Sequence, residues 1–299
     1  MTIHYDPRQS VSGLESYSPS AGKPADFVEL AGNYRYDLDG PAHWGDVQPV
    51  TRDDLVRVHH PAYVEGVFAG TTLNGFENRD PRVPTSCLWT IGSLLAAARS
   101  ALGHPAAVQC SPSSGFHHAG YAWGGGFCTF NGLLVVAARL LAEKPGLKIG
   151  ILDCDFHYGD GTVDILKKLP DLAKSIRHHT SGLHFHAGDD PDEFSLWLDE
   201  SIADLNAFGC DLVLYQAGAD MHIEDPLGGL LDDAQMRQRD RTVFTKVRAA
   251  VAWNLAGGYR SGESLFTNPV LQTHRDTLAA SRSAYPIRCN FHPIERSSW

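Results

Sequence analysis

The stretch ILDCDFHYGDGT, residues 151–162, begins as an apolar strand and ends among charged side chains. Asp153, Asp155 and His157 occupy alternate positions just before the chain breaks at a Gly-Asp-Gly sequence. Unpaired carboxylates inside a sheet would cost roughly several kcal/mol each. A metal ion is the expected compensating charge. The stretch therefore predicts a metal site at the end of a buried strand.

The pattern around this stretch predicts an α/β fold. Short apolar runs suited to strands alternate with amphipathic stretches suited to helices, which favours a parallel sheet covered by helices on both faces. The expected strands are 106–110, 148–154, 211–218 and 250–257, and the expected helices are 87–102, 130–144, 192–209 and 232–250. No shift in composition marks a boundary, so residues 1–299 are expected to form one domain.

Composition narrows the class of protein. The formal net charge of -10 argues against nucleic acid as a partner. The N-terminal residues lack the apolar core of a signal peptide, and no apolar run is long enough to span a bilayer. Six cysteines show no CxxC pairing and indicate a reducing, cytoplasmic compartment.

Polar clusters follow each of the four expected strands. In such sheets a ligand site lies at the carboxyl ends of the strands. After the first strand comes GFHHAGYAWGGGFCTFN (115–131), after the third YQAGADMHIEDPLGG (215–229) and after the fourth WNLAGGY (253–259). A histidine pair alone is weak evidence, since HH also occurs at 59–60 and 178–179, and Asp160 could simply cap a helix. The polar clusters indicate a functional site because all four are expected to lie together at the carboxyl edge of the sheet.

Five motifs in this order, HH, GGGFC, DCDFHYGDGT, QAGAD and AGGY, resemble the zinc-dependent histone deacetylase family, including its acetylpolyamine amidohydrolase branch. The resemblance covers roughly residues 50–260. It implies the arginase-deacetylase fold, a three-layer α/β/α arrangement with a central, mostly parallel sheet. It also implies a zinc-dependent amidohydrolase that removes acetyl groups from acetylated lysines or polyamines.

The resemblance assigns metal ligands and catalytic residues. Zinc would be bound by Asp155, His157 and Asp220. His118 would act as general base and then acid, with His117 as an electrostatic partner, and Tyr259 would polarise the amide carbonyl. Asp153 and Asp160 would orient His117 and His118 respectively.

The same resemblance implies substrate and potassium sites. The carbonyl of Gly126 would accept the substrate N–H, and Phe127 and Phe185 would form opposite walls of an acyl-lysine tunnel. A structural potassium ion would be bound by backbone oxygens around Asp153, Asp155 and His157. The polar loop 74–85 is a candidate rim from its own composition. Its acidic residues Glu77 and Asp80 are either solvated charges partly offset by Arg79 and Arg82, or a site that attracts a second positive charge on the substrate.

The sequence also departs from the family pattern and leaves rival classes open. Tyr158 replaces the second histidine common in the family. The tail 274–299 lies beyond the resemblance, and we expect a capping helix there, with a docking element as the alternative. A dimanganese ureohydrolase would need more aspartates than the Gly218-Ala219-Asp220 sequence offers. A non-catalytic acyl-lysine-binding module would lack a ligand or the tyrosine. The choice between an acetylated small amine and a lysine side chain, and homo-oligomerisation, stay undecided.

Overall fold

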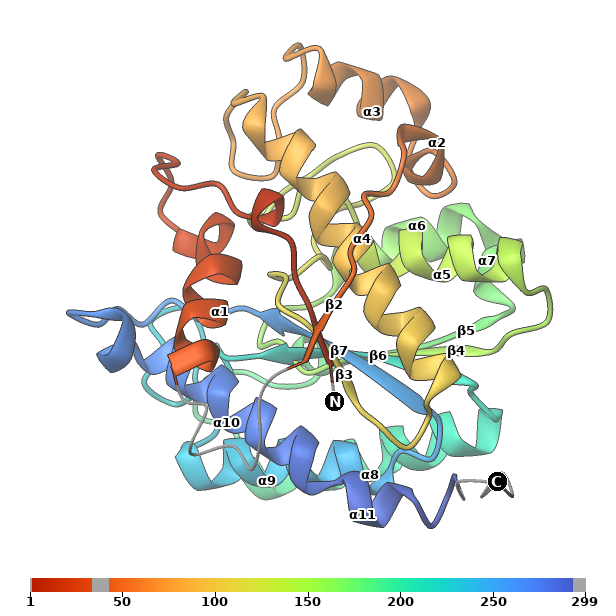
Figure 1. Cartoon of the computed structure of the whole chain (residues 1–299), viewed down its shortest axis with the longest axis vertical. Coiled ribbons are helices and arrows are strands. Elements are labelled where there is room, and N and C mark those ends of the chain that lie inside the picture. Colours follow the sequence, from red (N-terminus) through yellow and green to blue (C-terminus); the bar gives the residue numbers. More distant parts are fainter. Residues whose placement is uncertain (1, 34–42, 293–299) are drawn as a thin grey trace.

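The computed structural model describes residues 2–33 and 43–292 (Figure 1). Its sheet has seven parallel strands in the order β2-β1-β3-β7-β6-β4-β5. The strands are β1 (Thr2–His4), β2 (His43–Gly45), β3 (Gln109–Ser111), β4 (Ile149–Asp153), β5 (Ile176–Thr180), β6 (Leu212–Gly218) and β7 (Ala250–Ala256). The α-helices are α1 (Lys23–Asn33), α2 (Arg52–Leu55), α3 (Pro61–Phe68), α4 (Arg82–Gly103), α5 (Gly132–Glu143), α6 (Asp160–Lys168), α7 (Pro170–Ala173), α8 (Pro191–Phe208), α9 (Asp233–Lys246), α10 (Pro269–Ser283) and α11 (Tyr285–Arg288).

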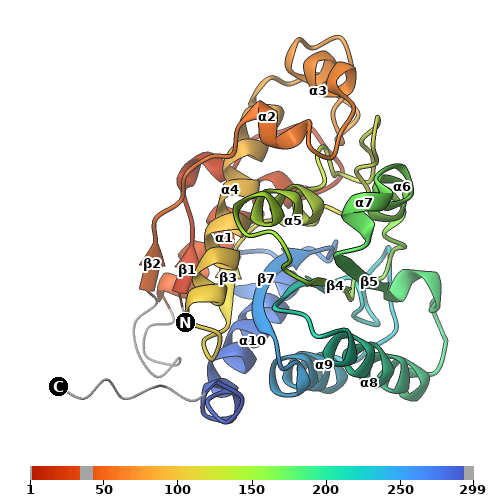
Figure 2. The ribbon, with the colours of Figure 1, turned by 90° about the vertical axis from the view of Figure 1, so that its right-hand side faces the viewer.

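The sheet separates two hydrophobic cores. Along β6, Leu212 and Leu214 face one core, whereas Val213 and Tyr215 face the other, as the two-residue period of a strand requires. Helices α4 and α5 cover the first face, and α8, α9 and α10 cover the second (Figure 2). The predicted three-layer α/β/α class with a parallel sheet is therefore confirmed.

The expected elements match the observed ones to within a few residues at most ends. The four central strands and helices α5, α8 and α9 all lie inside or close to their predicted ranges. Helix α4 begins five residues before the expected 87, at Arg82. Strands β1, β2 and β5 were not predicted. The expected capping helix of the tail is present as α10 and α11, while 293–299 lies outside the described residues.

The order of the central strands positions the polar clusters. Strands β3, β7, β6 and β4 are neighbours in the sheet, and all are parallel, so the segments that follow them emerge at one edge. Among residues 2–33 and 43–292, no helix is long and apolar enough to cross a membrane. That residues 1–299 form one domain stays a prediction.

Candidate metal centre and active site

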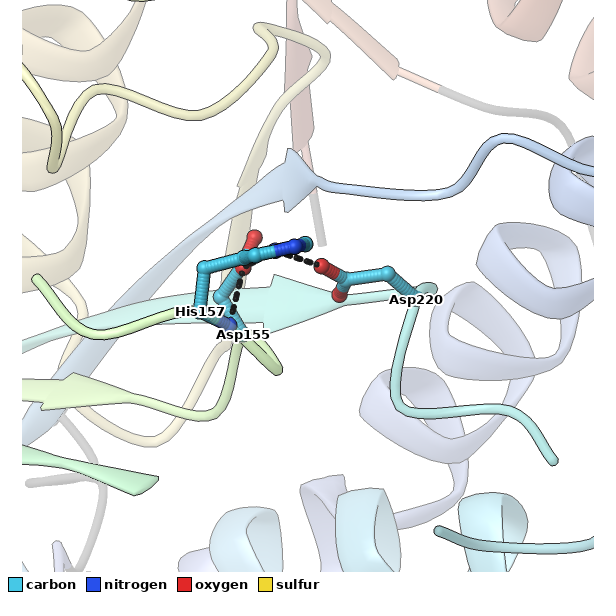
Figure 3. A group of neighbouring side chains, drawn as sticks. All are labelled: Asp155, His157 and Asp220. Atoms are coloured by element: carbon cyan, nitrogen blue, oxygen red, sulfur yellow. Dashed lines mark hydrogen bonds and ion pairs between the residues drawn. The ribbon is translucent and has the colours of Figure 1, made fainter. Parts of the chain in front are cut away.

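Three potential metal ligands lie together where β4 and β6 end. One ligand atom from each of Asp155, His157 and Asp220 lies within 4.8 Å of the other two (Figure 3). The Nδ1 atom of His157 is 2.9 Å from Asp220 Oδ2 and 3.2 Å from Asp155 Oδ1. The loop after β4 supplies two of these side chains and the loop after β6 supplies the third, so the site depends on the pairing of these two strands.

The electrostatics of this cluster fit a bound cation. Burial raises the pKa of Asp220, and the neighbouring Asp155 carboxylate raises it further, to about 7. Burial opposes the charge on His157 too, but the two carboxylates raise its pKa to about 11. Two buried carboxylates that face each other repel unless a positive charge lies between them. Zn²⁺ is bound by histidine nitrogens and carboxylate oxygens, and catalytic zinc sites use three protein ligands, the number present here.

The tandem histidines lie beside this cluster, each against an aspartate. His117 Nδ1 is 2.8 Å from Asp153 Oδ2, and both side chains are almost fully buried. His118 Nδ1 is 2.7 Å from Asp160 Oδ1, where the side chains are 21% and 45% exposed. The two imidazole rings are 4.1 Å apart between centroids. The four residues predicted as two histidine–aspartate pairs are thus brought together as pairs.

The two histidines differ in their protonation. Burial opposes charge on His117, yet the carboxylates of Asp153 and Asp155 raise its pKa to about 9. Burial and the nearby His117 together lower the pKa of His118 in spite of Asp160. His118 is therefore the member of the pair that is neutral near pH 7 and able to accept a proton.

Tyr259 reaches the site through a glycine turn. Gly257 and Gly258 have φ of +47° and +88°, which favours glycine, and a Cβ at Gly257 would lie 2.3 Å from Asp220 Cγ. The backbone N–H of Tyr259 donates to Asp225 Oδ2 at 2.7 Å. Burial raises the pKa of Tyr259, so its hydroxyl stays protonated and can donate a hydrogen bond.

A small cavity opens beside Tyr259. It is lined by Lys23, Gly126, Phe127, Asp155, Gly257 and Tyr259, among others. Gly126 packs directly on the tandem histidine loop, because a Cβ there would lie 2.4 Å from His118 Cδ2. Phe127 has a φ of +64°, an uncommon conformation for a residue with a side chain. Its N–H donates to Gly75 O at 2.9 Å, which holds the turn in place.

Phe185 is not part of this cavity, contrary to the predicted tunnel wall. Its ring is 6% exposed and packs in the core against Phe194 and Trp197 of α8. The ring stacked beside Phe127 is instead that of Tyr17, with centroids 6.5 Å apart and planes 18° apart. Tyr17 is also 6.5 Å from the ring of Tyr259. Phe185 follows the 3-10 turn Ser181–Leu183, and its N–H donates to Ser181 O at 3.1 Å, which fixes the backbone beside the buried ring.

Sequence reasoning missed several residues of the site. Gln216 Nε2 donates to Asp153 Oδ1 at 2.8 Å, and its Oε1 accepts the N–H of Phe116, so it fixes the aspartate beside His117. Its place in the quoted YQAGAD motif was the available signal. Lys23 donates to the carbonyl of Gly257, and no sequence signal pointed to it. Burial lowers the pKa of Lys23 to about 8, although Asp220 and Asp155 oppose this shift.

Fold and site together define an α/β protein with a candidate metal centre and paired histidines at the carboxyl edge of a parallel sheet. The chain belongs to the histone deacetylase family, since residues 33–185 match the histone deacetylase domain. The matched range contains the tandem histidines, Asp155 and His157. Asp220 and Tyr259 lie beyond it.

Relatives agree with this membership. An uncharacterised protein of Picosynechococcus sp. is 30% identical over 228 residues, which cover 69% of this chain and 75% of that protein. The acetylpolyamine amidohydrolase of Mycoplana ramosa is 30% identical over 196 residues, 49% of this chain and 57% of that protein. The alignment thus spans little more than half of the latter.

Solved structures show the same fold. The crystal structure of the HDA15 HD domain superimposes with a TM-score of 0.71 at 18% identity, over 97% of this chain and 94% of that one. An acetylpolyamine aminohydrolase from Burkholderia pseudomallei has a TM-score of 0.71 at 16% identity, over 96% of this chain and 99% of that one.

Proposed function

We propose that the protein is a zinc-dependent amidohydrolase that removes acetyl groups from acetylated amines. The observation that carries the proposal is the convergence of Asp155, His157 and Asp220 within 4.8 Å, next to two histidine–aspartate pairs. Membership in the histone deacetylase family supports the same reaction class. The relatives include acetylpolyamine amidohydrolases, which supports an acetylated amine as substrate.

Asp155, His157 and Asp220 would hold the zinc ion. When bound, the ion would lower the pKa of a water molecule and polarise the substrate carbonyl. The carboxylates of Asp155 and Asp220 lie within 4.8 Å of each other, and two buried carboxylates this close are better tolerated with a dication between them. The neighbours of Asp220, Gly218 and Ala219, carry no side-chain ligand atoms, which favours one metal over the two of a ureohydrolase.

The histidines would transfer the protons. With Nδ1 of His118 facing Asp160, its Nε2 is free to accept a proton from the attacking water and later to give it to the leaving amine. His117, held by Asp153 and charged, would stabilise negative charge in the site. Tyr259 would donate its hydroxyl proton in a hydrogen bond to the carbonyl oxygen as that oxygen becomes negative. Acetate and a free amine would result.

The substrate would enter beside Phe127. The carbonyl of Gly126 would accept the amide N–H, and Phe127 with Tyr17 would flank the alkyl chain. For a structural potassium ion, the carbonyl oxygens of Asp153 and Asp155 are the candidates. Both face the hydroxyl of Ser181, at 3.3 and 2.7 Å, so they point to a common place.

A parallel deacetylation screen tests the proposal. The purified protein is stripped of metal, reloaded with one equivalent of zinc and assayed for acetate release from acetyl-lysine peptides and from acetylated polyamines. We expect hydrolysis of at least one class, lost in the metal-free protein and restored by zinc. Protein that binds zinc stoichiometrically and hydrolyses neither amide would overturn the proposed function.

A further inference from the structure

Arg239 of α9 is buried beside the two backbone segments that carry the candidate metal ligands. Its side chain is 1% exposed. The Nη1 atom donates to the carbonyl oxygen of Gly218 at 2.6 Å and to that of Cys154 at 3.3 Å. Cys154 directly precedes the ligand Asp155, and Gly218 lies two residues before the ligand Asp220. One guanidinium nitrogen thus joins the two chain segments that carry the carboxylate ligands.

The bridge begins where the backbone pairing of these segments ends. The register of β4 and β6 ends at the pair Asp153 and Gln216, followed by one more bond from Cys154 N to Gln216 O. Beyond it the two segments still approach closely, since a Cβ at Gly218 would lie 2.4 Å from the Cα of Asp155. A side-chain donor here can fix the separation of the segments after the ladder has ended.

Arg239 is itself held in one orientation. Its Nε donates to Asp240 Oδ1 at 3.0 Å, and the same oxygen accepts the hydroxyl of Tyr215 at 2.5 Å. The other oxygen of Asp240 accepts the hydroxyl of Thr277, from α10, at 2.5 Å. The guanidinium is therefore fixed by groups from β6, α9 and α10, and its fork geometry cannot be reproduced by an ammonium group.

Stability alone is a poor reason for this arrangement. Replacing a buried ion pair by apolar residues of similar volume is often neutral or stabilising, because desolvation offsets the attraction between the charges. The pair of Arg239 and Asp240 is almost fully buried, with side chains 1% and 2% exposed. Its distinguishing feature is the contact of Arg239 with the two carbonyls beside the ligand positions.

We propose that Arg239 is a positioning residue that sets the spacing of Asp155 and Asp220 by bridging the carbonyls of Cys154 and Gly218. The proposal rests on the proposed function, because it takes these carboxylates as metal ligands. It extends that function by assigning the geometry of the metal site to a residue of α9 that contacts neither ligand side chain.

Metal binding tests the proposal without recourse to activity. Arg239→Lys keeps the charge but cannot bridge both carbonyls while also contacting Asp240. Arg237→Met is the matched control, because Arg237 lies on the same helix in an exposed pair with Asp276. Zinc affinity is measured by chelator competition, and the visible absorption of the Co²⁺-loaded protein reports the ligand geometry. Unfolding of the metal-free proteins in denaturant is measured alongside.

We expect Arg239→Lys to lose about tenfold to 100-fold in zinc affinity, the range seen when groups that orient metal ligands are removed, and to shift the Co²⁺ bands. Arg237→Met should match the wild type in both. A purely structural role would lower the free energy of unfolding and leave the Co²⁺ bands unchanged, and that result overturns the proposal. If Arg239→Lys does not fold, Asp240→Asn, which keeps Arg239 but weakens its anchor, should shift the bands in the same sense, and unchanged bands in it overturn the proposal.

These outcomes separate the two proposals. Wild-type protein that binds zinc through Asp155 and Asp220 but releases no acetate overturns the proposed function and leaves the Arg239 proposal to be decided by affinity and spectrum. If the Asp220→Asn variant binds zinc with the same affinity as the wild type, both proposals are overturned, because the carboxylates are then not the ligands.

Discussion

His118 Nδ1 lies 2.7 Å from Oδ1 of Asp160, the first residue of α6. The neighbouring pair, His117 with Asp153, has the same contact at 2.8 Å but is shut off from solvent, and Gln216 holds its aspartate. Similar contacts in different surroundings would give the two histidines different tasks under the proposed function. The pair nearer to solvent would exchange protons, whereas the buried pair would supply fixed charge.

His118→Ala should therefore lower kcat by roughly 100-fold to 10,000-fold, the contribution of a positioned general acid or base. Zinc content should stay at the wild-type level, because His118 is not a proposed ligand. His117→Ala should have a milder effect on kcat. The measurement is steady-state kinetics together with metal analysis of each variant. A His117→Ala protein with the larger loss would mean that the two roles are exchanged.

Tyr259→Phe separates chemistry from metal binding. The variant removes one hydroxyl and leaves the ring that packs 5.8 Å from Phe127. Loss of an oxyanion donor costs about 100-fold or more in kcat, and we expect that loss with KM and zinc content nearly unchanged. Full turnover in this variant would reduce the tyrosine to a packing role.

The proposed metal ligands can be tested directly. Asp220→Asn removes a charge at nearly constant volume, which matters because the carboxylate packs against Gly257. We expect the variant to lose tight zinc binding and activity together. Circular dichroism of the metal-free protein establishes that it is folded. One zinc bound at wild-type affinity in this variant would contradict the ligand assignment.

Sequence patterns predicted the features that depend on local chemistry and periodicity. The central strands are continuous apolar runs because both faces of the sheet are covered. The acidic and histidine residues that follow these strands meet in space because the parallel strands all end at one edge. Strands β1 and β2, which lie next to each other at one side of the sheet, have three residues each, too few for a periodic signal. Strand β5, IRHHT, is polar at its centre and was not recognised.

Long-range packing within the site could not be read from the sequence. Lys23 reaches Gly257 across 234 residues, and Tyr17 meets Phe127 only after the N-terminal segment folds over the site. Neither contact produces a local sequence pattern from which it could be predicted. Phe185 is the opposite case, because the resemblance implies a tunnel wall whereas the side chain is buried in the core against Phe194 and Trp197.

The rim loop offers a test of substrate charge. Asp80 is paired with Arg82 at 2.6 Å, whereas Glu77 is exposed and comes after Phe76, whose ring is 5.9 Å from Phe127. Glu77→Gln should therefore lower kcat/KM for an acetylpolyamine relative to an uncharged acetyl-lysine substrate, by up to about tenfold. Asp80→Asn is the control and should leave this ratio unchanged. An unchanged ratio in Glu77→Gln would show that the loop does not select for charge.

Acid should destabilise the loop that carries the tandem histidines, through His59. This buried ring uses both nitrogens, with Nδ1 2.8 Å from Gly120 O and Nε2 accepting the N–H of Asn131 at 2.9 Å. Burial lowers its pKa from 6.5 to about 4, against the opposing effect of backbone hydrogen bonds. The unfolded chain therefore binds more protons between these values, and the free energy of unfolding should fall by roughly 3 kcal/mol as the pH drops from about 6.5 to about 4.

Denaturant unfolding of the metal-free protein across this pH range measures the effect. His59→Gln can keep a donor and an acceptor but cannot titrate, so its unfolding free energy should depend less steeply on pH than that of the wild type. Some dependence should remain, because burial also lowers the pKa of His4 and His178 to about 4. His60→Gln, at the exposed neighbouring position, is the matched control and should keep the wild-type slope. Equal slopes in the His59 variant and the wild type would mean that the ring is not kept neutral by burial.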